Sequence, residues 1–134
     1  MRNLAAFTAI VALGNLAVTI WHLRLAGELN PALSFAEATR IGAMTVVLTL
    51  SGVSLLWAKR RLIGSLVLVV VFAIGLVIGS LEHFFIPGPN NVFDAGMGGT
   101  AFLFRLSVAL LLVLEMTGFW GAARLIRSVS RSAG

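Results

Sequence analysis

Four long apolar runs, almost free of charged side chains, dominate this sequence of 134 residues. A helix that spans a bilayer needs about 20 predominantly apolar residues, and each run is long enough. Hydrophobic residues make up 59% of the chain and charged residues only 11%, whereas soluble domains contain about half and about a quarter. The runs therefore predict an integral membrane protein, in which four spans with short connections leave no room for a soluble catalytic domain.

The connections between the runs predict the order of the helices. Lys59-Arg60-Arg61 is too short for anything but a tight turn between antiparallel helices. Pro87-Gly88-Pro89 ends the third run, because proline lacks the N–H that a helix needs. We expect an all-α fold, a single-domain transmembrane four-helix bundle in up-down-up-down order across residues 1–134. The expected helices cover 4–26, 35–58, 62–86 and 100–126, and a loop over 87–99 serves as a connector or as a lid.

The basic residues predict the orientation of the helices in the membrane, because cytoplasmic flanks carry an excess of Lys and Arg. One side of the expected bundle collects seven of them and the other side three. The seven are Arg2, Lys59, Arg60, Arg61, Arg124, Arg127 and Arg131, and the three are Arg24, Arg40 and Arg105. We therefore expect a multi-pass protein of the cell membrane, the inner membrane in a bacterium, with both termini cytoplasmic.

Two histidines lie at similar depth in different expected helices. His22 is four residues before the end of the first helix and His83 is three before the end of the third. At a rise of about 1.5 Å per residue, both lie roughly 5–6 Å below the helix end. Glu82 adjoins His83, and Asp94 belongs to the loop above. The sequence thus predicts a polar layer that faces outward and in which the two imidazoles can meet.

A divalent metal ion is one interpretation of this layer. His22, Glu82, His83 and Asp94 offer imidazole nitrogens and carboxylate oxygens, which suit Zn, Cu(II) or non-haem Fe. Adjacent residues such as Glu82 and His83 point about 100° apart on a helix, so both cannot face one ion without distortion. The metal site is therefore a hypothesis with a geometric difficulty.

Two further interpretations of the layer stay open. The side chains can be interfacial residues that hydrogen-bond to one another, to Arg40 or Arg105 and to lipid headgroups. Alternatively, His22 and His83 can be the axial ligands of a b-type haem whose propionates bind Arg105.

Glu115 stands apart from this layer, near the middle of the fourth expected helix. Asn15 and Thr49 lie near the middles of the first and second helices, so a cluster of intramembrane polar groups is geometrically possible. Lys and Arg are absent at that depth, and an isolated carboxylate in hydrocarbon is costly. We expect Glu115 to be neutral and to donate a hydrogen bond to Asn15 or to a carbonyl. Its role is then either a structural link between helices or an intramembrane functional site.

The composition also narrows the function. The chain has no cysteine, which excludes disulfides, thiolate catalysis and Cys-ligated metal clusters. The net charge of +5 is explained by topology, so we expect no nucleic-acid partner. No catalytic residue is assigned, and an enzyme is the less favoured reading. We expect a non-enzymatic accessory or structural subunit that contacts lipid and itself or other membrane subunits, or a binder of a hydrophobic ligand or cofactor. The alternative is a small proton-coupled transporter or a haem- or metal-binding redox protein.

Overall fold

The computed structural model describes residues 2–30, 35–88 and 90–133, with side chains outside 35–41 and 132–133. Arg40, one of the basic residues counted above, lies outside the described side chains. Within the described ranges every regular element is helical and no strand occurs. The elements are α1 (Arg2–Leu29), α2 (Phe35–Trp57), α3 (Arg61–Ile74), η1 (Gly75–Gly79), η2 (Leu81–Phe85) and α4 (Gly99–Ala133).

Two of these elements are π-helical turns that continue α3. η1 and η2 extend the helix that begins at Arg61 as far as Phe85. A π turn contains more residues than an α turn, so it rotates the positions that follow and is frequent at functional sites. Within η2, His83 is buried, whereas the adjacent Glu82 is half-buried. The polar positions of this helix therefore do not all face the same way.

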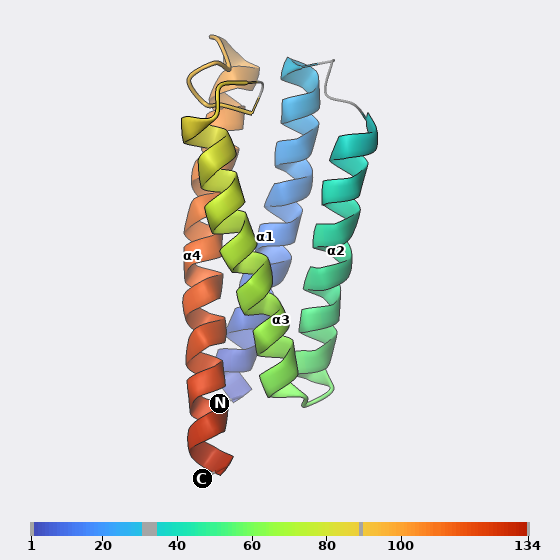
Figure 1. The fold of residues 1–134 in the computed structure, drawn as a ribbon, viewed down its shortest axis with the longest axis vertical. Coiled ribbons are helices and arrows are strands. Elements are labelled where there is room, and N and C mark those ends of the chain that lie inside the picture. Colours follow the sequence, from blue (N-terminus) through green and yellow to red (C-terminus); the bar gives the residue numbers. More distant parts are fainter. Residues whose placement is uncertain (1, 31–34, 89, 134) are drawn as a thin grey trace.

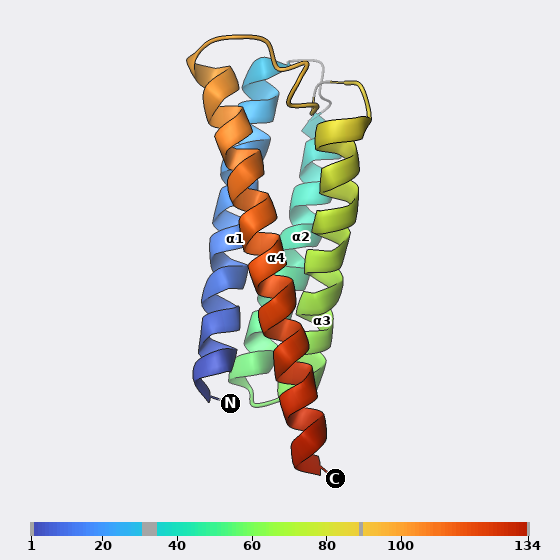
Figure 2. The same ribbon diagram turned by 90° about the vertical axis from the view of Figure 1, so that its left-hand side faces the viewer.

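The helix α4 is longer than the sequence predicts. It reaches Ala133, so the residues expected to form a polar tail after 126 are helical instead. Its 35 residues correspond to about 52 Å at 1.5 Å per residue, against about 30 Å of hydrocarbon in a bilayer. Figure 2 shows its last turns extending past the other helices. Helical hydrogen bonding continues there because this segment contains no proline or glycine after Gly121.

In the part of the chain that the structure describes, three helices are long and apolar enough to cross a membrane: Arg2–Leu29, Arg61–Phe85 and Gly99–Arg131. A fourth, Gly42–Trp57, is a shorter apolar helix within the described side chains. Large apolar side chains are exposed along all four, among them Ile10, Val47, Val77 and Val113. Surfaces of this kind are unsuited to water, and the chain is therefore a membrane protein.

The helices lie side by side with their long axes nearly aligned (Figure 1). The N-terminus, the turn at 58–60 and the C-terminus lie at one end, which we call the turn end. The loop over 86–98 lies at the other end, which we call the loop end. The half of the molecule nearer to each end is named the turn half or the loop half.

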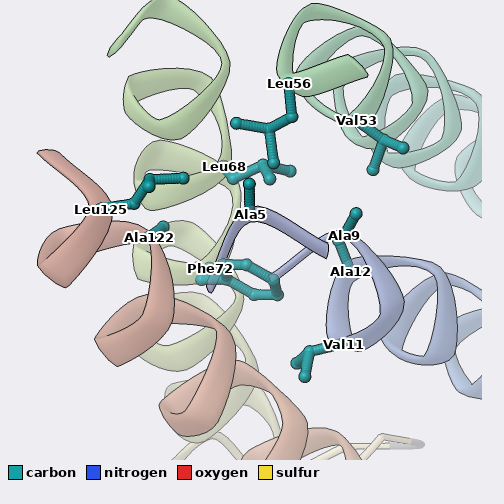
Figure 3. Close-up of a cluster of buried hydrophobic side chains, with 10 residues drawn as sticks. All are labelled: Ala5, Ala9, Val11, Ala12, Val53, Leu56, Leu68, Phe72, Ala122 and Leu125. Atoms are coloured by element: carbon teal, nitrogen blue, oxygen red, sulfur yellow. The ribbon is translucent and has the colours of Figure 1, made fainter. Parts of the chain in front are cut away.

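The turn half contains an apolar core to which all four helices contribute (Figure 3). Its members are Ala5, Ala9, Val11, Ala12, Val53, Leu56, Leu68, Phe72, Ala122 and Leu125. Glycine permits the closest approaches. A Cβ added to Gly64 would lie 2.8 Å from the carbonyl oxygen of Gly52, and one added to Gly118 would overlap the ring of Phe72. These small residues therefore serve packing within the chain.

The loop half has a second, smaller core that involves the loop itself. Val92 of the loop is buried together with Leu25 and Ala26 of α1 and Phe104 and Val108 of α4. The loop is thus folded down onto the helices. This arrangement determines what surrounds the two histidines.

Candidate functional site

The structure brings His22 of α1 and His83 of η2 into contact in the loop half. The two residues are 5% and 7% exposed, respectively. Their ring centroids are 4.8 Å apart and the ring planes form an angle of 76°. This is an edge-to-face contact of the kind that aromatic rings favour. The imidazoles therefore share one buried site.

A hydrogen bond to the protein orients each imidazole. The Ser107 hydroxyl donates to the carbonyl oxygen of Phe104 at 2.7 Å, so its oxygen accepts from Nδ1 of His22 at 2.9 Å. Nδ1 of His83 donates to the carbonyl oxygen of Asn90 at 2.8 Å, because a carbonyl can only accept. Both rings therefore carry a proton on Nδ1, and neither of these hydrogen bonds uses Nε2.

Phe104 completes this site, and the sequence analysis did not single it out. Its ring is fully buried, with its centroid 4.9 Å from that of His22 and 6.2 Å from that of His83. Phe104 precedes Ser107 by about one helical turn, so both residues lie on the side of α4 that contacts His22. Both histidine rings thus pack against the ring of Phe104.

The loop over 87–98 is tied to the helices by several hydrogen bonds. Arg105 donates from Nε to the carbonyl oxygen of Val92 at 3.0 Å and from a terminal nitrogen to that of Gly96 at 2.7 Å. The N–H of Val92 donates to the carbonyl oxygen of His83 at 2.9 Å. Asn91 adds a bond from its side-chain amide to the carbonyl oxygen of Ile86 at 3.1 Å. Arg105 therefore holds the loop in place.

The carboxyl groups proposed as metal ligands do not join the histidines. Glu82 is only half-buried, and an oxygen of Asp94 accepts from the N–H of Gly88 at 3.0 Å. Across the described residues, His, Asp and Glu side chains form no group of three or more that could hold a metal ion. The pair of His22 and His83 thus lacks a third ligand within this part of the chain.

The arrangement of the histidines does not fit a haem either. Two axial ligands lie on opposite faces of the porphyrin with the iron between them. Rings that touch each other edge-to-face leave no space for the macrocycle. Next to the histidines, Val92 of the loop packs against apolar side chains of α1 and α4. An open cavity of about 350 Å³ lies farther out, between the end of α1 and the loop, and is lined by Leu29, Asn30, Gly88, Asp94 and Ala95. The site as it stands is a packed and hydrogen-bonded polar layer.

A second group of polar residues lies deeper, away from the histidines. Glu115, Asn15 and Thr49 are all buried. The carboxyl group of Glu115 lies against Gly75, where η1 begins. Among the described residues, Oδ1 of Asn15 and Oγ1 of Thr49 have no hydrogen-bond partner, so the expected bond from Glu115 to the Asn15 oxygen is not formed. The described part of the interior thus contains an amide oxygen and a hydroxyl group without a hydrogen-bond partner.

Comparisons of the sequence and structure with family models, curated proteins and solved structures give no match.

Proposed function

We propose that the chain is a single-domain, four-span integral membrane protein, an up-down-up-down four-helix bundle with both termini in the cytoplasm. The turn end supports this orientation, because the N-terminus, the turn at 58–60 and the C-terminus with their basic residues lie together there (Figure 1). In a bacterium the membrane would be the inner one.

Cysteine labelling tests this topology directly, since the chain has no native cysteine. Ala58 and Met97 are exposed at the turn end and the loop end, respectively. A membrane-impermeant maleimide applied to intact cells should label Met97→Cys and should label Ala58→Cys only after lysis. Labelling of only Ala58→Cys in intact cells would show the opposite orientation. Equal labelling of both variants in intact cells would exclude a single orientation.

The favoured function is that of a non-enzymatic accessory or structural subunit of a membrane complex. The supporting observation is that helices hold nearly all of the described chain while the longest described connection is tied down by Arg105. The surfaces open to a partner are then the apolar sides of the helices. Such a subunit would contact lipid and other membrane helices rather than soluble molecules.

Cross-linking from single cysteines tests the accessory role. Ile10, Met44, Val77 and Val113 each present an exposed side chain on a different helix. A specific product that forms at native expression from one helix face, and not from the other three, would support a subunit contact. Absence of any product from all four positions would contradict it.

A second candidate is a small proton-coupled transporter that uses Glu115. The observation that favours it is the position of this carboxyl group, buried against the π turn at Gly75. Acids in the membrane interior commonly serve proton or ion pathways. Glu115→Gln should abolish dissipation of an imposed pH gradient in liposomes, whereas Glu82→Gln, at the loop end, should retain it. Equal dissipation by both variants would exclude the carrier role.

A further inference from the structure

The last part of α4 carries three arginines on the side that faces away from the bundle. Arg124, Arg127 and Arg131 are exposed, and their spacing of three and four residues places them on one side of the helix. Leu125, which follows the first of them, is fully buried in the apolar core of the turn half. This segment therefore has a buried apolar side and an exposed basic side.

An aromatic ring holds the first of these arginines in place. The guanidinium carbon of Arg124 lies 4.8 Å from the centroid of the Trp120 ring, one helical turn earlier. This distance is typical of a cation–π interaction. The Trp120 side chain is itself exposed, so the ring and the guanidinium group together form part of the outer surface of α4.

The positive charge at the turn end is not balanced by acidic residues of the chain. Residues 38–81 and 116–134 contain no Asp or Glu. In the described part of the chain, the one ion pair joins Arg24 and Glu28, and it lies at the loop end. The turn end also carries Arg2 and the basic residues at 59–61 (Figure 1). This end therefore presents a basic surface that attracts negative charge from outside the chain.

The length of α4 determines the depth of the arginines in a bilayer. Arg124 lies 19 residues after Arg105, about 28 Å along the helix, which matches the hydrocarbon thickness of about 30 Å. Arg124 is therefore at the hydrocarbon boundary, with Arg127 about 4–5 Å and Arg131 about 10 Å farther out. The headgroup layer is about 5–8 Å thick on each side. Arg124 and Arg127 thus lie among the headgroups, and Arg131 lies beyond them.

The chemistry at this depth favours a phospholipid over a soluble acidic partner. A guanidinium group donates two parallel hydrogen bonds to phosphate oxygens, and phosphate is the group that headgroups offer at this level. Exposed tryptophans, Trp57 and Trp120, lie at the same end, as is typical of helices at a membrane interface. Basic clusters directly beside a span attract anionic lipids in particular.

We propose that Arg124 and Arg127, with Arg124 stacked on Trp120, bind the headgroup of an anionic phospholipid in the leaflet that surrounds the turn end. Arg131 and the basic turn at 59–61 add attraction over a longer distance. This inference goes beyond the accessory role, because it names the class of lipid that the chain selects. It applies to either orientation of the bundle in the membrane.

Quenching of tryptophan fluorescence by brominated lipids tests the site in reconstituted full-length protein. Trp21→Phe and Trp57→Phe leave Trp120 as the reporter, since the chain has three tryptophans. Brominated phosphatidylglycerol should bind at Trp120 at least fivefold more tightly than brominated phosphatidylcholine, because one basic residue near a membrane surface contributes about fivefold in affinity. Arg124→Gln combined with Arg127→Gln should bring this ratio close to one.

Two single variants are the controls for this measurement. Arg131→Gln should change the ratio less than twofold, because charges beyond the headgroups are screened over about 8 Å at physiological salt. Arg24→Gln removes one exposed charge at the loop end and should leave the ratio unchanged. Equal quenching by the two lipids in the parent protein would overturn the proposal, and an acidic soluble partner would then be the alternative.

Thermal unfolding in detergent keeps the proposal falsifiable if the double variant folds poorly. Added phosphatidylglycerol should raise the melting temperature of the parent protein more than the same amount of phosphatidylcholine. Arg124→Lys should retain only part of this difference, because lysine keeps the charge but cannot donate two parallel hydrogen bonds. Equal melting temperatures of the parent protein with the two lipids would contradict an anionic lipid site.

Discussion

The two halves of this molecule are held together by different interactions. In the turn half, helices meet through small residues and fully buried apolar side chains, as where the Phe72 ring lies on Gly118 (Figure 3). In the loop half, side-chain hydrogen bonds link separate elements. His22 binds Ser107, and His83 binds the backbone of Asn90.

The contrast follows from the surroundings of each half. Lipid is as apolar as leucine, so helices inside a membrane gain little from burying apolar area and associate through close packing or hydrogen bonds. The loop exposes backbone N–H and C=O groups that need partners. Histidine, serine and arginine side chains supply hydrogen bonds in the loop half. The loop half is therefore stabilised mainly by hydrogen bonds, and the turn half by close packing of side chains.

The largest expected effect comes from removing the buried aromatic ring of either half. Phe72→Ala and Phe104→Ala should each lower the free energy of unfolding by about 3–5 kcal/mol, since both rings are fully enclosed. Thermal or denaturant unfolding in detergent measures this loss. Phe102→Ala, 63% exposed, is the control and should change little. A similar loss of unfolding free energy in all three variants would contradict the stabilising role assigned to the two buried rings.

Overpacking tests the close helix contacts of the turn half. Gly118→Ala places a Cβ in the Phe72 ring and should cost about 1–3 kcal/mol of stability. In Gly14→Ala the new Cβ lies 3.9 Å from Leu114, an ordinary contact, so stability should be unchanged or slightly raised. Melting temperatures of the two variants compare them. A tolerant Gly118→Ala variant would contradict the close packing assigned to the turn half.

Removing one hydrogen bond tests the loop half in the same way. Ser107→Ala leaves the buried Nδ1 proton of His22 without its acceptor, which should cost about 1–2 kcal/mol. ¹⁵N NMR of labelled histidine should show a changed Nδ1 signal for His22. Ser51→Ala, at an exposed position of α2, should leave both stability and spectrum as they are. An unchanged His22 signal in Ser107→Ala would show that the bond is absent.

The smallest expected effect concerns the surface of the loop. Arg105→Ala removes two bonds to loop carbonyls but from an exposed side chain, so stability should fall by only about 1 kcal/mol. Protease cleavage within 87–98 should nevertheless become faster. Arg24→Ala, which breaks the exposed pair with Glu28, should cost about 0.3–0.5 kcal/mol and leave cleavage unchanged. Equal cleavage in both variants would remove Arg105 as the residue that holds the loop.

Much of the helical organisation could be predicted from the pattern of residues. The positions of His22 and His83 near the same ends of their helices indicated that they could meet, because the rise per residue is constant along a helix. The buried state of Asn15, Thr49 and Glu115 likewise agrees with their location far from any basic residue. Such features depend on one helix at a time, and periodicity is enough to derive them.

Which groups each polar side chain contacts could not be derived in this way. The sequence offered Arg105 as a ligand for propionates, whereas the structure has it binding loop carbonyls. The Glu115 carboxyl group lies against Gly75 of the neighbouring helix, whereas the sequence suggested Asn15 or a carbonyl as its partner. Glu82 was grouped with the histidines, but it is only half-buried.

The sequence by itself determined that this chain is helical and belongs in a membrane, because the cost of placing charged groups and unpaired backbone in lipid acts on every residue separately. Only the tertiary structure decided which polar side chains face one another. That outcome depends on how helices rotate about their axes, and two π turns change the rotation of one helix in a way that a regular period does not encode.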